Sequence, residues 1–207
     1  MVLDVINGAL RASLVTFALC GFAYPLTVTA LGQWLMPFQA NGSLLLDARG
    51  TPLGSQLIGQ QWNDPQWFHG RPSATTDADP NDATRTIPAP YNAASSGASN
   101  LGPTSKALEG RIVDAWKTLD DAEPETTNNA LPADMLTASA SGLDPDISPA
   151  NAFLQVNRVA NARGVAPERV AALVKRQITP RDLAVFGEPR VHVLQLNLAL
   201  EREFPMR

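Results

Sequence analysis

An uncharged apolar run dominates the N-terminal part of the chain. Residues 12–31, ASLVTFALCGFAYPLTVTAL, carry no charged side chain over about 20 positions, which at helical rise spans a hydrocarbon core of roughly 30 Å. The pattern predicts a transmembrane helix over residues 12–36, after an N-terminal segment over residues 1–11 and before a soluble domain over residues 37–207. Pro25 removes one backbone hydrogen bond within the run and is expected to bend the helix.

Two other interpretations of this run stay open. A cleaved signal peptide needs a positively charged start, but Asp4 opposes Arg11, and residues 28–30 form only an imperfect cleavage site. A lipoprotein signal needs a small residue before its cysteine, and Leu19 precedes Cys20. A retained membrane helix is therefore favoured.

The charges beside the run indicate an orientation. Arg11 lies on the N-terminal flank, and the first charge beyond the run is Asp47. By the positive-inside rule this favours a cytoplasmic N-terminus at residues 1–11 and an exported, periplasmic domain at residues 37–207.

Helical periodicity returns in the second half of the chain. A helix is predicted after Pro103, with one apolar face made by Leu108, Ile112, Ala115, Trp116 and Leu119. Ser148 and Pro149 read as an N-cap followed by proline at the first helical position, and Gly164 as a left-handed stop. A further helix is predicted to start near Pro167, and the short connection makes an αα-hairpin. The predicted inward residues of the pair are Phe153, Val156, Val159, Ala160, Val170, Leu173, Val174 and Ile178.

Strand signals are weaker. Residues 56–62 are predicted as a short strand and residues 73–90 as irregular, while Trp62, Trp67 and Phe68 indicate a small aromatic core under a loop. Residues 189–204 fit either a short strand followed by a helix or a helix throughout. The predicted class is α+β: a single N-terminal transmembrane helix, then one mostly helical exported domain with a small, short-stranded sheet.

Composition excludes several classes of protein. The net charge of -4 and the scattered basic residues argue against nucleic-acid binding, and a helix-turn-helix role for the predicted hairpin is discounted on the same ground. The single cysteine excludes an intramolecular disulfide, so the fold must hold by packing.

Candidate chemistry is sparse. His69 and His192 have no Cys, Asp or Glu at metal-ligand spacing, so no metal site is predicted. The order Thr104, Ser105, Lys106 is not that of a phosphate-binding P-loop, which needs Gly-Lys before the hydroxyl residue. A turn before a capped helix explains Asp144 and Asp146 without catalysis, and no catalytic residue is predicted.

Two segments of small residues are the candidate site. They are 91–105, YNAASSGASNLGPTS, and 136–152, LTASASGLDPDISPANA, and each runs into an amphipathic helix. We interpret them as ordered segments where backbone approaches backbone, acting as a docking surface or, alternatively, as a nucleotide-binding loop. The residues proposed for either role are Ser95, Ser96, Gly97, Ser99, Asn100, Gly102, Ser139, Ser141 and Gly142.

The amino-acid sequences of four segments resemble those of a known family. FHGRPSA at residues 68–74, the two small-residue segments, and GEPRVHVLQLNLAL at residues 187–200 follow in this order behind one N-terminal span. They resemble the KdpC family, small subunits of the bacterial high-affinity potassium-transporting Kdp ATPase, over nearly the whole chain. At four positions the chain has a residue other than the one usual in the family, namely Ala98, Ser105, Asp146 and His192.

The resemblance implies a place in a bacterial inner-membrane complex. Its implied partners are a channel-like potassium-translocating subunit, a P-type ATPase subunit and a very small single-span subunit. The resemblance implies that the complex transports potassium and hydrolyses ATP, and that this chain binds neither of them tightly. The family role it implies is assembly and stabilisation, together with a chaperone effect that raises the ATP affinity of the ATPase subunit.

Three functional hypotheses follow. An accessory subunit with an exported domain is the first, and a subunit that contacts ATP directly through the small-residue segments is the second. Because an exported domain cannot reach cytoplasmic ATP, either the orientation inferred from Arg11 is wrong or the chaperone effect passes through the membrane helices. A secreted solute-binding protein is the third.

Overall fold

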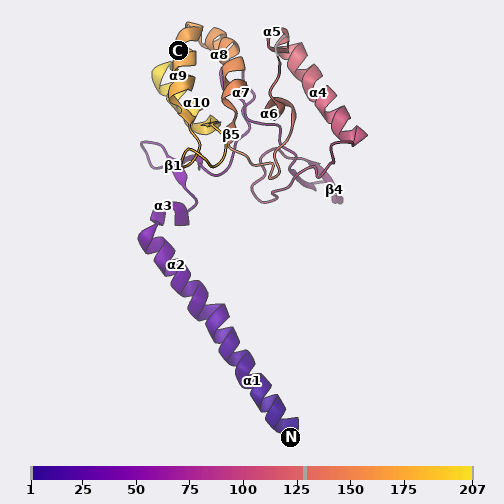
Figure 1. Ribbon diagram of the computed structural model, residues 1–207, viewed down its shortest axis with the longest axis vertical. Helices are drawn as coiled ribbons and strands as arrows, with labels where there is room; N and C mark the ends of the chain where they lie inside the picture. The colour runs from indigo at the N-terminus through magenta and orange to yellow at the C-terminus, as the bar shows by residue number, and fades with distance from the viewer. Residues whose placement is uncertain (1, 128–129, 207) are drawn as a thin grey trace. The chain divides into compact units, whose positions relative to one another are not determined.

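The N-terminal unit is mainly one long helix. The computed structural model describes residues 2–127 and 130–206, and the chain divides into two compact units, residues 1–53 and 54–207. Helix α1 (Val2–Ala18), the π-helical turn η1 (Leu19–Ala23) and α2 (Tyr24–Leu35) run end to end (Figure 1). The turn η1 ends two residues before Pro25, and the N–H of the next residue, Tyr24, donates to the Leu19 carbonyl. A π turn is one of the ways in which a helix accommodates a proline.

The long helix has the properties of a membrane span. Val2–Leu35 is 34 residues long and apolar enough to cross a bilayer, and none of its residues is buried. Its large apolar side chains are between 47% and 77% exposed. Lipid is the environment in which such exposure carries no hydrophobic penalty. After it come α3 (Pro37–Ala40) and β1 (Leu44–Leu46), which pairs with β2 (Pro52–Ser55).

The second unit holds the core. It contains the hairpin β3 (Thr76–Asp79) and β4 (Asp82–Pro88), then α4 (Lys106–Ala122), α5 (Pro124–Thr127) and α6 (Ala133–Leu136). It continues with β5 (Asp146–Ile147), α7 (Pro149–Leu154), α8 (Val156–Arg163), α9 (Pro167–Arg176), β6 (Ile178–Thr179), β7 (Arg190–His192) and α10 (Val193–Glu203). Helices α7 to α10, β5 and β7 supply most of the buried side chains, with Phe68 added from the preceding loop: Ile147, Ala152, Val156, Val159, Ala160, Val170, Leu173, Val174, Val191, Val193, Leu196, Leu200 and Phe204.

The small sheet is antiparallel, with strand order β5-β7-β6. Val191 of the central strand lies opposite Ile147 on one side and Ile178 on the other. The side chains of Val191 and Ile147 are part of the core, and Ile178 packs against it. Asp146 and His192 are directly opposite each other on β5 and β7. Both are positions at which the chain differs from the residue expected from the resemblance.

The predicted α+β class with one N-terminal span is confirmed. Ser148 caps α7 by accepting the Asn151 N–H, and Gly164 ends α8 in the left-handed region at φ 63°. The αα-hairpin is present, and the C-terminal segment takes the strand-then-helix form. Trp62 and Trp67, 5.0 Å apart, pack with buried Phe68 against the core as expected.

Two strand predictions were wrong. The strand lies at Pro52–Ser55 and not at residues 56–62, because Gly59 donates its N–H to the Leu143 carbonyl at 2.8 Å and the segment binds a loop instead of a ladder. Residues 76–88 form a hairpin around a turn in which Asp79 accepts the Asn81 N–H. Most of this hairpin is exposed on both faces, so no apolar alternation marks it in the sequence.

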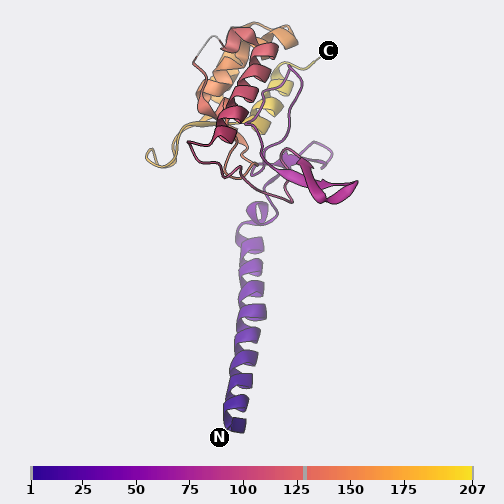
Figure 2. The same cartoon turned by 90° about the vertical axis from the view of Figure 1, so that its right-hand side faces the viewer.

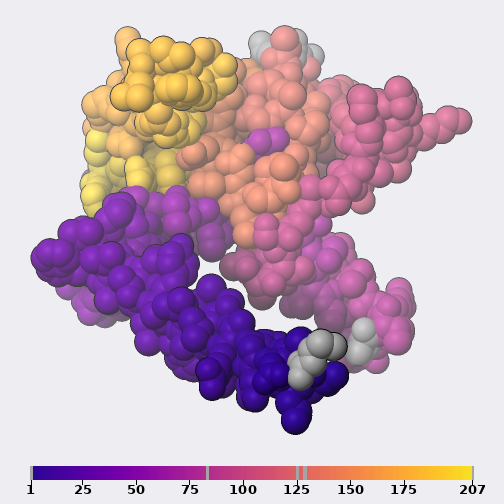
Figure 3. Space-filling model, turned by 60° about the horizontal axis from the view of Figure 1, so that its bottom comes forward, coloured from indigo at the N-terminus to yellow at the C-terminus, as the bar shows by residue number. Residues whose placement is uncertain are grey.

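Two helical predictions need correction. Phe153 is 42% exposed because Ala152 takes the inward position one turn before Val156. Ile178 lies in β6, beyond the end of α9. Helix α4 forms where predicted, but its apolar face is only half-buried and Trp116 is 41% exposed. Figures 1 and 3 show α4 at the outer edge of the unit, where it contacts α5 and α6.

Gly142 gives a test of this fold. It has φ 67°, and a Cβ there would lie 2.8 Å from the Gly97 carbonyl oxygen and 2.6 Å from Thr75 Cγ2. Gly164 has almost the same φ with open space around it. We expect Gly142→Ala to lower the free energy of unfolding by about 1–3 kcal/mol more than Gly164→Ala, because both carry backbone strain but only the first overpacks. Urea unfolding of the full-length chain in detergent measures both; equal losses would contradict the close approach of the two segments.

Candidate functional site: a polar pocket behind the Phe68–Ala74 segment

Two buried side-chain amides hold the backbone at Phe68 and His69. The Phe68 N–H donates to Asn197 Oδ1 at 2.8 Å, and Asn197 Nδ2 donates to the Phe68 carbonyl at 2.9 Å. Gln155 repeats the pattern on His69, with contacts of 2.8 and 3.1 Å. Asn197 is fully buried and Gln155 is 3% exposed. The amides thus act as a neighbouring strand would, satisfying backbone groups that water cannot reach.

Two arginines extend this clamp toward the aromatic pair. Arg158 donates to the carbonyls of Pro65 and Trp67 at 2.7 and 2.8 Å. Arg163 donates to the Gln66 carbonyl at 3.0 Å and lies 4.4 Å from the Trp67 ring centroid, a cation–π distance. Every residue from Pro65 to His69 therefore receives a contact from α8, α10 or Gln155.

A further amide network supports Gln155. Its Nε2 donates to Asn151 Oδ1 at 2.7 Å, and Asn151 Nδ2 donates to Asp134 Oδ2 at 3.0 Å. Asp134, from α6, also accepts the N–H and the hydroxyl of Ser148. Hydrogen bonds from Ser148 and Asn151 to the Asp134 carboxylate thus tie the start of α7 to α6.

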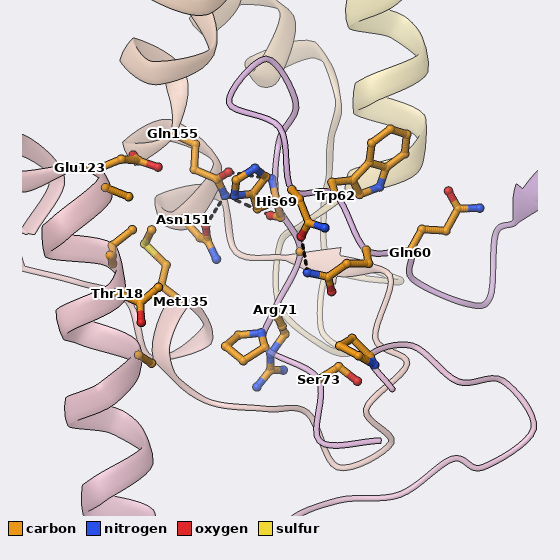
Figure 4. Close-up of a pocket in the computed structure, with 18 of the residues that line it drawn as sticks. Gln60, Trp62, His69, Arg71, Ser73, Thr118, Glu123, Met135, Asn151 and Gln155 are labelled. Carbon is orange, nitrogen blue, oxygen red and sulfur yellow. Dashed lines mark hydrogen bonds between the residues drawn. The ribbon is translucent and has the colours of Figure 1, made fainter. Parts of the chain in front are cut away.

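These residues wall a pocket of ≈ 450 Å³ (Figure 4). One wall carries His69, Asn151 and Gln155, and the opposite wall carries Thr118, Glu123 and Met135 from α4, its end and α6. The floor and rim add Gln60, Gln61, Trp62, Asn63, Gly70, Arg71, Pro72, Ser73, Pro90, Tyr91, Ala115, Leu119, Ala122 and Arg158.

The charged groups of the pocket are paired. Arg158 Nε lies 2.5 Å from Glu123 Oε1, with both side chains nearly buried, and Arg71 donates to Asp144 Oδ2 at 3.0 Å. Burial lowers the pKa of Arg158, and the Glu123 carboxylate opposes that shift. The Arg158–Glu123 pair joins the end of α4 to α8, so losing one partner would leave a charge uncompensated.

Two titratable groups of the pocket, His69 and Tyr91, have pKa values shifted toward their neutral forms. Burial, with Arg158 nearby, lowers the pKa of His69. Burial, with Asp144 nearby, raises the pKa of Tyr91 to about 12, and its hydroxyl donates to the Arg71 carbonyl at 2.7 Å. A neutral imidazole, a protonated phenol and paired ions can all hydrogen-bond to a polar group in the pocket.

The structure brings five of the nine predicted loop residues together. Gly97 donates its N–H to the Ser141 carbonyl at 2.9 Å, and Ser96 donates its hydroxyl to the same oxygen at 3.1 Å. Ser139 Oγ accepts the Gly142 N–H at 2.8 Å. The two segments meet backbone to backbone as expected, and these donors are directed to the chain itself.

The other four lie apart from that junction. Ser95 donates its N–H to Asn92, Asn100 is exposed with φ 52°, and Ser99 and Gly102 lie along the path to α4. Among the described residues that line the pocket, none of the nine is present. A docking or nucleotide role for them stays a prediction.

The roles of Gln155, Asn197 and Arg158 were not predicted from the sequence. Asn197 has a signal in hindsight, because it occupies a buried position on the apolar face of α10 next to Leu196. Gln155 lies at the junction of α7 and α8, where periodicity gives no guide. Within residues 2–127 and 130–206, no three His, Cys, Asp or Glu side chains gather at metal-binding distance.

Comparison with known proteins decides the family. The sequence model described as "KdpC: K+-transporting ATPase, c chain" matches residues 6–202. The chain belongs to the KdpC family. A potassium-transporting ATPase KdpC subunit of Bradyrhizobium diazoefficiens is 53% identical over 197 residues, covering 95% of this chain and 96% of the relative. One from Rhodopseudomonas palustris strain BisB18 is 51% identical, covering 96% and 98%.

Family membership makes the chain a component of a potassium-transporting ATPase complex. One N-terminal helix of this KdpC chain has the length and composition of a membrane span. The four segments that carried the resemblance all lie within the matched range.

Asn197 tests the clamp of this KdpC domain. We expect Asn197→Leu to strand two buried backbone groups at about 1–3 kcal/mol each, and so to lower the free energy of unfolding by about 2–6 kcal/mol. Asn157→Leu, on the exposed face of α8, is the matched control and should change it by less than about 0.5 kcal/mol. Urea unfolding followed by tryptophan fluorescence measures both. Equal effects would show that the amide contributes nothing specific.

Proposed function

We propose that this chain is a non-catalytic accessory subunit that assembles and stabilises its potassium-transporting complex. The N-terminal helix anchors it in the bacterial inner membrane, and the folded unit docks on the channel-like potassium-translocating subunit over the potassium entrance. The P-type ATPase subunit and a very small single-span subunit are its other partners. The main support for this proposal is that the chain belongs to the KdpC family and also has a long apolar helix in which no residue is buried.

The polar groups of the folded unit favour binding over catalysis. Its buried ions are paired, its two predicted loop segments direct their donors at each other, and its pocket holds neutral hydrogen-bonding groups. ATP and potassium are then handled by partner subunits, and neither is a firm ligand of this chain.

The orientation follows from the flanking charges. Arg11 on the N-terminal side and the absence of charge between it and Asp47 favour a cytoplasmic N-terminus with the folded unit exported to the periplasm. Any rise in ATP affinity of the ATPase subunit is then an indirect coupling through the membrane-spanning parts. Direct ATP contact through the small-residue segments is the second candidate, and it requires the folded unit to lie in the cytoplasm.

Removing the folded unit tests the accessory role. We expect deletion of residues 40–207 to reduce co-purification of the partner subunits and to weaken the potassium dependence of ATP hydrolysis, because the docking surface is lost while the anchor remains. Affinity purification through a tag on the ATPase subunit and potassium titrations measure both. Gly110→Ala, at an exposed position of α4 with open space around it, is the control. Unchanged assembly and potassium affinity in the deletion would overturn the proposal.

A further inference from the structure

An uncharged segment continues beyond the end of the long helix. Helix α2 ends at Leu35, yet the first charged residue after Arg11 is Asp47. Residues 36–46, MPFQANGSLLL, therefore follow the helix without a charge, and we call them the juxtamembrane segment. Four of its large apolar side chains are at least 43% exposed, namely Met36, Phe38, Leu44 and Leu46. Exposed apolar side chains gathered in one short segment mark a contact surface.

Two flanking residues indicate where the long helix leaves the bilayer. At helical rise Arg11 and Trp34 lie about 35 Å apart, which fits a hydrocarbon core of roughly 30 Å with one residue in each interface. Trp34 is 77% exposed, and tryptophan is enriched where membrane meets water. With the helix anchored as proposed, its last turn lies at the level of the lipid headgroups.

Hydrogen bonds hold the juxtamembrane segment beside that last turn. Asn41 Nδ2 donates to Gln33 Oε1 at 3.1 Å and to the Pro37 carbonyl at 2.7 Å. Figures 1 and 2 show the short helix α3, which Asn41 follows, at the end of the long helix. Leu44 comes three residues after Asn41, so the chain places it within about 11 Å of that contact. The start of β1 therefore stays close to the end of the span.

The strand β1 has an apolar outward face. Leu44 and Leu46 are both exposed, whereas Leu45 between them is half-buried. Alternate residues of a strand share a face, and the face that a sheet turns to water usually carries polar side chains. Here that face carries leucine. Such a face suits an apolar environment, where its exposure carries no hydrophobic penalty.

A polar turn ends the juxtamembrane segment. The Asp47 carboxylate accepts the N–H groups of Arg49 and Thr51, both at 2.8 Å. Asp47 and Arg49 are the first charges beyond the span, and they are opposite in sign. Because charged side chains are costly within the hydrocarbon core, this turn marks the limit of the chain that lipid can cover.

We propose that the juxtamembrane segment lies in the interface of the phospholipid bilayer, with Phe38, Leu44 and Leu46 inserted among the lipids. This inference rests on the proposed membrane anchoring and adds a second lipid contact to it. The bilayer is the occupant because it surrounds the helix end to which the segment is hydrogen-bonded. With no basic side chain between Arg11 and Asp47, insertion depends on apolar burial and not on anionic headgroups.

Spin-label accessibility tests the lipid contact on the full-length chain. With Cys20 replaced by serine, a nitroxide is attached at Leu44→Cys, at Val15→Cys within the span, or at Ala48→Cys in the exposed polar turn. Relaxation by oxygen, which concentrates in lipid, is compared with relaxation by a water-soluble nickel chelate in vesicles of zwitterionic phospholipid. We expect the oxygen-to-nickel ratio at Leu44 to lie between the ratios at Val15 and Ala48, because interfacial side chains reach only the boundary of the acyl chains. A ratio at Leu44 equal to that at Ala48 would overturn the proposal.

The same label distinguishes lipid from other occupants. A label at Leu44 that is water-accessible in vesicles, and shielded from both reagents only in the assembled complex, would identify a partner subunit. Dipolar broadening that grows with the density of the chain in the vesicles would identify a second copy. Insertion only in vesicles containing anionic phospholipid would identify electrostatic attraction as its cause. Each of these results contradicts the proposal.

The outcome is separable from that of membrane anchoring. A label at Val15 that is as accessible to nickel as the label at Ala48 would refute the anchor and this inference together. A lipid-like label at Val15 with a water-like label at Leu44 would refute the juxtamembrane contact alone.

Discussion

The folded unit depends on satisfying the backbone of one buried, extended segment. Phe68 is fully buried, yet no strand within residues 2–127 and 130–206 pairs with it, and the side chains of Asn197 and Gln155 supply the missing partners. An unsatisfied backbone group in such a place costs about 1–3 kcal/mol, so α10 and the α7–α8 junction, which carry the two amides, are held in register with the segment. The pocket wall depends on that register. So do the Trp67–Arg163 contact and the hydrogen bond from the Tyr91 hydroxyl to the Arg71 carbonyl.

The sequence predicted those parts of the fold in which one residue carries a local rule. Ser148, Gly164 and the apolar rows of α8 and α9 mark their helices because caps and periodicity act within a few residues. The β3–β4 hairpin escaped notice because exposed strands carry no apolar alternation. The candidate pocket could not be predicted, because Gln155 reaches His69 across 86 residues and no local pattern reports such a contact.

The chemistry of the unit suits a binding role. Its buried cations meet carboxylates, as in the Arg158–Glu123 pair, and its two small-residue segments bind each other through Gly97 and Ser141. Large apolar side chains are also exposed on its surface, among them those at residues 183–186 between β6 and β7 and Trp116 of α4. Family membership makes the chain a component of the transporter complex, and the proposed accessory role assigns these surfaces to contacts with other subunits.

The side of the membrane on which the folded unit lies tests this account most directly. With Cys20 replaced by serine, Ser96→Cys provides a single exposed thiol on the loop before α4. Labelling by a membrane-impermeant maleimide should occur in cells whose outer membrane has been permeabilised, and should be blocked in inverted inner-membrane vesicles. Protection in those cells with reaction in inverted vesicles would place the unit in the cytoplasm, favour direct ATP contact and contradict the exported accessory domain.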